Sequence, residues 1–150
     1  MFFVDRMLGK LAKKLRLLGF DTVYSSHMCE EEIMQLCKET GRILITKDRE
    51  LLRKAVEQGI RCLYVASDDW RQQLVELSKK IDLKSSKRMS RCSLCNVELI
   101  NANEEEIKKK VPFYVQQTCK DFYLCPACGR VYWAGSHVEH AEETFRRLGL

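Results

Sequence analysis

Four cysteines late in the chain have the spacing that points most directly to chemistry. They form two C-x-x-C pairs, Cys92 with Cys95 and Cys125 with Cys128. Four thiolates can occupy the tetrahedral corners that Zn²⁺ prefers. Each pair is followed by a residue that tolerates left-handed backbone, Asn96 or Gly129, so the chain can curl until backbone N–H groups point at the sulfurs. The pairs therefore predict a structural zinc site with no coordination position open to substrate.

The sequence around these cysteines favours a zinc ribbon over the alternatives. Two disulfides or a redox C-x-x-C would leave the matched turn residues unexplained. β-prone segments at 97–100, 122–124 and 131–133 predict hairpins clamped by the metal. The gap between the pairs exceeds the usual ~15–20 residues, which a helical insert at 103–110 explains. Cys119, His137 and His140 are alternative ligands, but they lack the turn residues.

Carboxylates are the second group of residues that could do chemistry. Five of them follow predicted strands or open the next helix: Asp5, Glu30, Asp48, Asp68 and Asp69. The carboxyl ends of parallel strands share one edge of a sheet, where α/β proteins place their sites. Oxygen ligands suit Mg²⁺ or Mn²⁺, which can activate water against a phosphodiester. Any one of these acids taken alone is better explained as a helix cap.

The elements that must position these acids come from the first 82 residues. Short β-rich runs at 2–4, 22–24, 42–46 and 62–66 alternate with amphipathic helical segments. Strands joined by crossover helices require a parallel sheet with helices on its faces, so residues 1–82 predict an α/β domain. Asp21 begins the second strand, so we expect it at the opposite edge in a structural role. Residues 83–91 are polar and basic and predict a linker. Residues 92–150 predict the zinc ribbon and a C-terminal helix from about His137 to Leu148.

Basic residues on the first predicted helix suggest a polyanionic partner. Arg6, Lys10 and Lys13 lie opposite its leucine stripe, and Lys14 and Arg16 flank them. A basic surface leading to an acidic, metal-binding edge suits a nucleic acid. The alternative is a solvated polar face, since every amphipathic helix has one.

Composition limits the remaining choices. Apolar residues make up 45% of the chain and charged residues 31%, with a net charge of +5. No apolar run approaches the roughly 20 residues of a membrane span, and the charges at Asp5 and Arg6 come too early for a signal peptide. We therefore expect a cytoplasmic protein with no membrane partner.

At these residues the sequence resembles the PIN-like RNase family named for the C-terminal domain of the Mut-7 exonuclease. The resemblance is carried by 4–12, 15–22 and 41–49, and by Cys-Pro-Ala-Cys-Gly-Arg-Val-Tyr-Trp and Gly135-Ser136-His137 in the ribbon. It implies a PIN-like sheet and a metal-dependent nuclease acting on RNA. Asp5 and Asp48 match the family's acids. Glu30 stands where an aspartate is expected, within a divergent stretch at 27–29, and Asp68 and Asp69 match loosely.

Two functional hypotheses follow. In the first, the protein is a Mg²⁺- or Mn²⁺-dependent ribonuclease whose zinc ribbon helps to bind RNA or a ribonucleoprotein. Its RNA contacts would come from six basic residues: Arg6, Lys10, Lys13, Arg16, Lys47 and Arg49. In the second, it is a non-catalytic adaptor associated with RNA or the ribosome, which keeps the fold without the chemistry.

Overall fold

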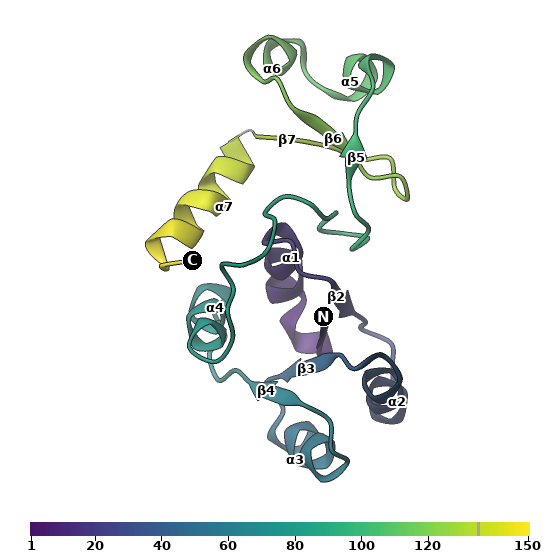
Figure 1. Ribbon diagram of the computed structural model, residues 1–150, viewed down its shortest axis with the longest axis vertical. Coiled ribbons are helices and arrows are strands. Elements are labelled where there is room, and N and C mark those ends of the chain that lie inside the picture. The colour runs from purple at the N-terminus through teal and green to yellow at the C-terminus, as the bar shows by residue number, and fades with distance from the viewer. Residues whose placement is uncertain (135) are drawn as a thin grey trace.

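The first part of the chain forms the predicted parallel sheet. In the computed structural model the described residues are 1–134 and 136–150, without the side chains of 136–139. Four strands pair in the order β2-β1-β3-β4, all parallel. Their bounds are β1 (Phe2–Val4), β2 (Thr22–Tyr24), β3 (Ile43–Thr46) and β4 (Cys62–Tyr64). The α/β prediction is confirmed (Figure 1), although the third and fourth strands are shorter than predicted.

Helices cover both faces of this sheet because successive strand residues point to opposite sides. Phe2 and Val4 join one core with the helices on their side, and Phe3 joins the other. A short 3₁₀ turn, η1, precedes α1. The elements are η1 (Arg6–Leu8), α1 (Gly9–Leu17), α2 (Glu30–Thr40), α3 (Arg49–Glu57) and α4 (Trp70–Ser78). Residues of α1 and α4 pack in the first core, and residues of α2 and α3 pack in the second. The result is three layers, helix on sheet on helix.

The segment predicted as a linker packs against the end of α1. Leu83 is buried in the first core, and the Met89 N–H donates to the Leu17 carbonyl at 2.9 Å. Gly19, at φ +96°, lies directly beneath this segment. A Cβ there would lie 2.1 Å from the Lys87 carbonyl oxygen, so only glycine permits the close approach.

The second part is the predicted ribbon. Three antiparallel strands form a small sheet in the order β5-β6-β7, with two helices inserted between β5 and β6. The elements are β5 (Ile100–Asn101), α5 (Glu104–Lys110), α6 (Phe113–Thr118), β6 (Phe122–Leu124) and β7 (Val131–Trp133). They share a separate core around Val111, Val115 and Phe122. The insert explains the long gap between the cysteine pairs.

The last helix, α7 (Ser136–Arg147), returns from the ribbon to the α/β part, where it lies beside α4 (Figure 1). Ala141, Phe145 and Leu150 are buried in the same core as α1 and α4, and Phe145 is only 1% exposed. The C-terminal helix thus follows the ribbon in sequence but packs on the α/β domain. Within the described part of the chain, no helix has the length and apolar character to cross a membrane.

Candidate metal centre and candidate active site

Four cysteine sulfurs converge at the start of the ribbon. The Sγ atoms of Cys92, Cys95, Cys125 and Cys128 all lie within 4.8 Å of one another, with 3.8 Å between those of Cys92 and Cys128. A tetrahedral zinc with Zn–S bonds near 2.3 Å separates its sulfurs by about 3.8 Å. The donor type, number and spacing all fit, so these cysteines could bind zinc.

Backbone geometry explains why the sulfurs meet. Asn96 and Gly129 have φ of 66° and 75°, the left-handed conformation predicted after each pair. The curl lets the Cys95 N–H donate to Cys92 Sγ at 3.4 Å, and the Cys128 N–H donate to Cys125 Sγ at 3.5 Å. Hydrogen bonds of this kind stabilise the thiolates that a metal requires.

Tyr132 also contributes to this centre, a role that the cysteine spacing did not predict. Its hydroxyl lies 3.0 Å from Cys92 Sγ. Burial raises the pKa of Cys92, but hydrogen bonds from Tyr132 and from the backbone of Cys95 and Leu94 oppose it and lower the pKa to about 7. In the sequence Tyr132 is an ordinary strand residue next to Val131. Its contact with Cys92 becomes visible only when the ribbon hairpin is folded.

The alternative ligands stay outside this group. Neither Cys119 nor His140 belongs to the converging set, and the Cys119 thiol lies 3.5 Å from the Ala134 carbonyl. The His137 side chain and Gly135, part of the motif that carried the resemblance, lie outside the described residues.

The carboxyl edge of the parallel sheet holds a buried carboxylate. Asp5 is 5% exposed; its Oδ1 accepts from the Arg6 N–H at 2.7 Å and its Oδ2 from Thr46 Oγ1 at 2.9 Å. Thr46 Oγ1 in turn accepts the Asp48 N–H at 3.0 Å. Thr46, the last residue of β3, thus connects the two acids that match the family. Among the described residues Asp5 has no ion-pair partner.

Three of the predicted acids act as helix caps, and Asp5 is one of them, because the hydrogen bond from the Arg6 N–H caps η1. Asp48 Oδ1 accepts from the N–H groups of Glu50 and Leu51 at 2.9 and 3.3 Å, at the start of α3. Asp69 caps α4 through the Arg71 N–H at 3.4 Å. Among the described residues the capping hydrogen bonds use only Oδ1 of Asp48, so its Oδ2 could accept a second partner.

The remaining predicted acids point elsewhere. Glu30 pairs with Lys54 of α3 at 2.8 Å, and the Asp68 carboxylate, 92% exposed, pairs with Lys47. Within the described residues the four cysteines are the one group of three or more candidate ligands that converges. The structure therefore links Asp5 with Asp48 through Thr46, and within the described residues no three of the five predicted acids converge.

The predicted RNA-binding residues fall into an exposed group and a group that is buried or ion-paired. Arg6, Lys10, Lys13 and Arg49 are exposed. Arg16 is only 7% exposed and does not face solvent, so it does not belong to an RNA-binding surface. Its guanidinium donates instead to three backbone carbonyls, those of Thr22, Ser93 and Leu94, at 2.9 to 3.0 Å. Lys47, the sixth predicted contact, is half-buried in its pair with Asp68.

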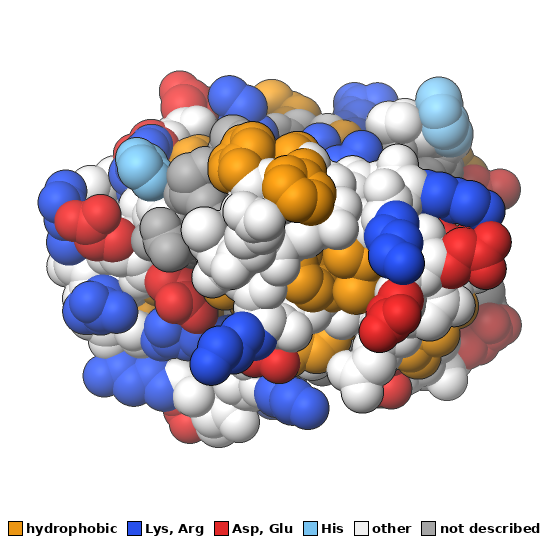
Figure 2. Space-filling model, turned by 90° about the horizontal axis from the view of Figure 1, so that it is seen from above, with side chains coloured by type: hydrophobic (Ala, Val, Ile, Leu, Met, Phe, Trp, Pro, Cys, Tyr) orange, Lys and Arg blue, Asp and Glu red, His pale blue; other side chains and the backbone are white. Residues whose placement is uncertain are grey.

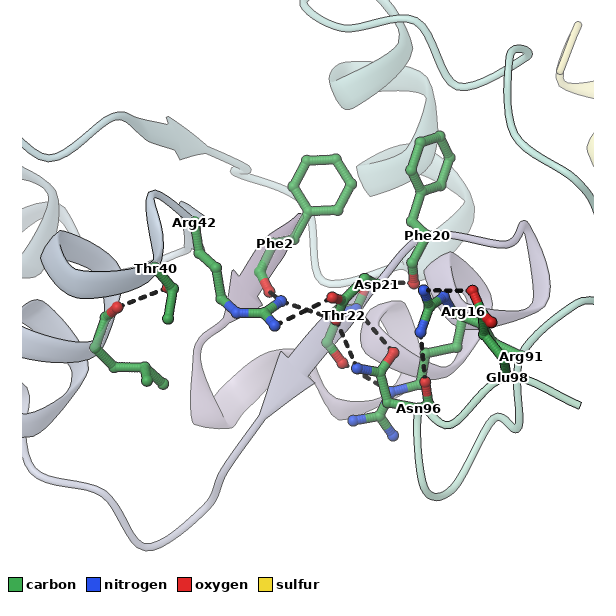
Figure 3. Close-up of polar contacts among 11 residues, drawn as sticks. Phe2, Arg16, Phe20, Asp21, Thr22, Thr40, Arg42, Arg91, Asn96 and Glu98 are labelled. Carbon is green, nitrogen blue, oxygen red and sulfur yellow. Dashed lines mark hydrogen bonds and ion pairs between the residues drawn. The ribbon is translucent and has the colours of Figure 1, made fainter. Parts of the chain in front are cut away.

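Arg16 is part of a polar network that joins the two parts of the chain at the amino edge of the sheet (Figure 3). Asn96 donates from Nδ2 to Asp21 Oδ1 at 2.7 Å and accepts the Thr22 N–H at 2.9 Å. Asp21 also pairs with Arg42 at 2.9 Å. Burial raises the pKa of Asp21, but its hydrogen bonds from Arg42 and Asn96 outweigh this and hold the pKa below its usual value. The first cysteine pair is thereby tied to the start of β2.

The chain combines a parallel sheet between helical layers, with acids at its carboxyl edge, and a ribbon with four converging cysteines. This defines the class: an α/β protein with a ribbon that could bind zinc. The model of the Mut7-C RNAse domain matches residues 1–145, so the chain belongs to the Mut7-C RNAse domain family. Membership indicates a nuclease role. No match was found among curated proteins or among solved structures.

Proposed function

We propose that this protein is a divalent-metal-dependent ribonuclease that hydrolyses RNA phosphodiester bonds at the carboxyl edge of its parallel sheet. The observation that carries the proposal is the buried Asp5 carboxylate, which has hydrogen-bond donors but no cationic side chain beside it among the described residues. A buried charge is normally paired or bound to a metal. Asp5 and Asp48 would hold a Mg²⁺ or Mn²⁺ ion, which when bound lowers the pKa of a water molecule and neutralises charge on the phosphate.

The chain's own residues orient this pair. Thr46 donates to Oδ2 of Asp5 and the Arg6 N–H donates to Oδ1, so the carboxylate is held in one orientation. The capping hydrogen bonds fix Asp48 in the same way. Glu30, Asp68 and Asp69 are left outside this pair because each has another partner.

The cysteine centre has a separate, structural part in the proposal. Four thiolates would complete the zinc coordination and leave no position for substrate. The eight cysteines are all free thiols, which suits the reducing environment of the cytoplasm. RNA would approach over the exposed basic residues Arg6, Lys10, Lys13 and Arg49.

The test compares Mn²⁺-dependent cleavage of a labelled single-stranded RNA by three proteins purified identically: wild type, Asp5→Asn and Asp121→Asn. Asparagine keeps the shape of Asp5 but removes the charge of a metal ligand, so cleavage should fall by orders of magnitude. Asp121 is exposed in the ribbon and makes the same charge change away from the edge. Its variant should cleave at the wild-type rate.

One observation favours a second function, that of a non-catalytic adaptor for RNA or the ribosome. Phe113 and Tyr114 at the start of α6 are 72% and 70% exposed. Hydrophobic side chains gather in the middle of the face seen from this end of the molecule (Figure 2). Exposed aromatic clusters are typical of binding surfaces. Equal cleavage by wild type and Asp5→Asn would refute the catalytic proposal and favour the adaptor.

A further inference from the structure

A hollow of about 400 Å³ lies between α1, α4 and the first cysteine pair. It is lined by basic, aromatic and small polar residues: Lys10, Lys13, Lys14, Leu17, Trp70 and Ser93. Lys10 belongs to the first turn of α1 and Leu17 ends that helix. A nine-residue helix is about 13 Å long, so the hollow extends along two turns of its surface.

The positive charge of this hollow is not neutralised. Within residues 1–134 and 136–150, none of Lys10, Lys13 and Lys14 makes an ion pair. Elsewhere on the surface, lysines of α3 and α5 are paired with glutamates. A cluster of unpaired cations in a concave surface raises the local concentration of anions.

Trp70 holds two of the cations in place. Lys14 Nζ lies 4.6 Å from its ring centroid, and the Arg71 guanidinium carbon lies 4.5 Å from the same ring. Attraction to the ring stabilises each cation where it stands. Burial lowers the pKa of Lys14, and repulsion from Arg71 and Lys13 lowers it further. An anion in the hollow would relieve this repulsion. Among the residues that the structure describes, the one acid paired with this group is Asp69, 3.5 Å from Arg71.

The helices that line the hollow begin at the same edge of the sheet as the candidate active site. α1 begins four residues after Asp5, and α4 begins directly after Asp69, so both helices start at the carboxyl edge of the sheet. The far end of the hollow reaches Ser93, between the first two cysteines. A strand lying along α1 would therefore pass from the candidate active site to the cysteine centre.

A hollow on the opposite face of the sheet is lined by acidic residues. This second hollow, of about 510 Å³, lies against α2 and is lined by Glu31, Glu32 and Glu39 together with uncharged residues. These glutamates repel a polyanion. Of these two hollows, only the one between α1 and α4 is therefore suited to a polyanion.

From these observations we infer that the hollow between α1 and α4 binds the phosphodiester backbone of a single RNA strand and leads it to the carboxyl edge. Lys10, Lys13 and Lys14 contact the phosphates, and Trp70 positions Lys14 and Arg71. The inference rests on the proposed function for the identity of the polyanion. It names a site for the strand that is distinct from the acids that would cleave it.

The test measures binding of a fluorescently labelled oligouridylate to the full chain by anisotropy, at several NaCl concentrations and without added divalent ions. The variant Lys10→Gln/Lys13→Gln removes two charges from the hollow. The matched control, Lys38→Gln/Lys120→Gln, removes two exposed, unpaired charges from α2 and the ribbon. Losing two phosphate contacts should lower affinity on the order of tenfold at low salt, and should reduce the salt slope by about 1.4. The control should bind like wild type.

Each outcome decides the inference. An equal loss in both double variants would show that only net charge matters and would overturn it, as would undetectable binding by wild type at low salt. Displacement of the oligouridylate by polyglutamate at equal charge concentration would overturn it in favour of an acidic protein partner. If the hollow variant binds and cleaves like wild type while Asp5→Asn does not cleave, the nuclease proposal stands and the inference fails. If binding depends on the hollow but Asp5→Asn cleaves normally, the inference stands alone.

Discussion

The two edges of the parallel sheet use polar residues in opposite ways. At the amino edge, Arg16, Asp21, Arg42 and Asn96 form a network in which cation, anion and amide satisfy one another and the backbone of the cysteine knuckle. At the carboxyl edge, Asp5 is more deeply buried than Asp21 but meets only neutral donors.

The difference separates structure from function. A polar group whose charge is matched inside the protein stabilises the fold and leaves no unsatisfied charge with which to bind a ligand. A buried carboxylate without a cation has its charge still to be neutralised, which is the condition for metal binding. The same criterion distinguishes the unpaired lysines of α1 from the glutamate-paired lysines of α3 and α5.

Removing the metal from the cysteine centre should have the largest effect on stability. Replacing Cys125 by Ser, or chelating the metal, should unfold the ribbon, because structural zinc contributes on the order of 10 kcal/mol to folding a small domain. The α/β domain should also melt at a lower temperature, since the first knuckle supplies partners to Arg16 and Asp21. Circular dichroism melting and zinc analysis would measure both effects.

The control for this prediction is Cys119→Ser, which alters a cysteine outside the converging group. It should keep about one zinc per chain and melt close to wild type. An identical melting profile for Cys125→Ser would show that the amino-edge network does not depend on the metal centre.

Breaking the amino-edge network directly should have the next largest effect. Arg16→Ala leaves the carbonyls of Thr22, Ser93 and Leu94 without their donor, at a cost of roughly 2–4 kcal/mol in the free energy of unfolding. Arg53→Ala removes an exposed arginine whose ion pairs lie within α3, and it should melt close to wild type because solvent screens such pairs.

The Arg16→Ala variant also tests whether the amino edge of the sheet is purely structural. RNA cleavage per folded molecule by Arg16→Ala should match wild type, because the Arg16 guanidinium is occupied by backbone carbonyls at the edge of the sheet opposite Asp5. A specific loss of RNA affinity without a loss of stability would return Arg16 to the binding surface, contrary to its burial.

Local patterns in the sequence were sufficient to predict the sheet, its helices and the cysteine centre, because strand periodicity, C-x-x-C spacing and left-handed turn residues are all short-range signals. The partners of Arg16 were not predictable in this way, since Ser93 lies 77 positions along the chain. The sequence identified Asn96 only as a residue that tolerates left-handed backbone. The hydrogen bond from its side chain to Asp21 was not predicted.

The candidate active site shows the same limit. Strand ends placed Asp5 and Asp48 at one edge, but Glu30 was predicted there from its position at a helix start. In the structure it faces α3 and pairs with Lys54, a contact across 24 positions that no local pattern reports. The return of Phe145 to the first core depends likewise on packing between distant segments.

The smallest expected effect sharpens the comparison at the carboxyl edge. Thr46→Val removes the hydroxyl that donates to Asp5 and accepts from the Asp48 N–H, at nearly constant volume. Stability should fall by about 1–2 kcal/mol. If Thr46 positions a metal ligand, cleavage at saturating Mn²⁺ should fall and half-maximal activity should require roughly 10- to 100-fold more Mn²⁺, as for other residues that orient metal ligands.

Thr46→Ser keeps the hydroxyl and should restore the Mn²⁺ dependence even if it packs less well. A purely structural Thr46 would instead lower stability in both variants and leave the Mn²⁺ requirement unchanged. That result would make Asp5 a structural carboxylate, as Asp21 is, and the two edges would no longer differ in kind.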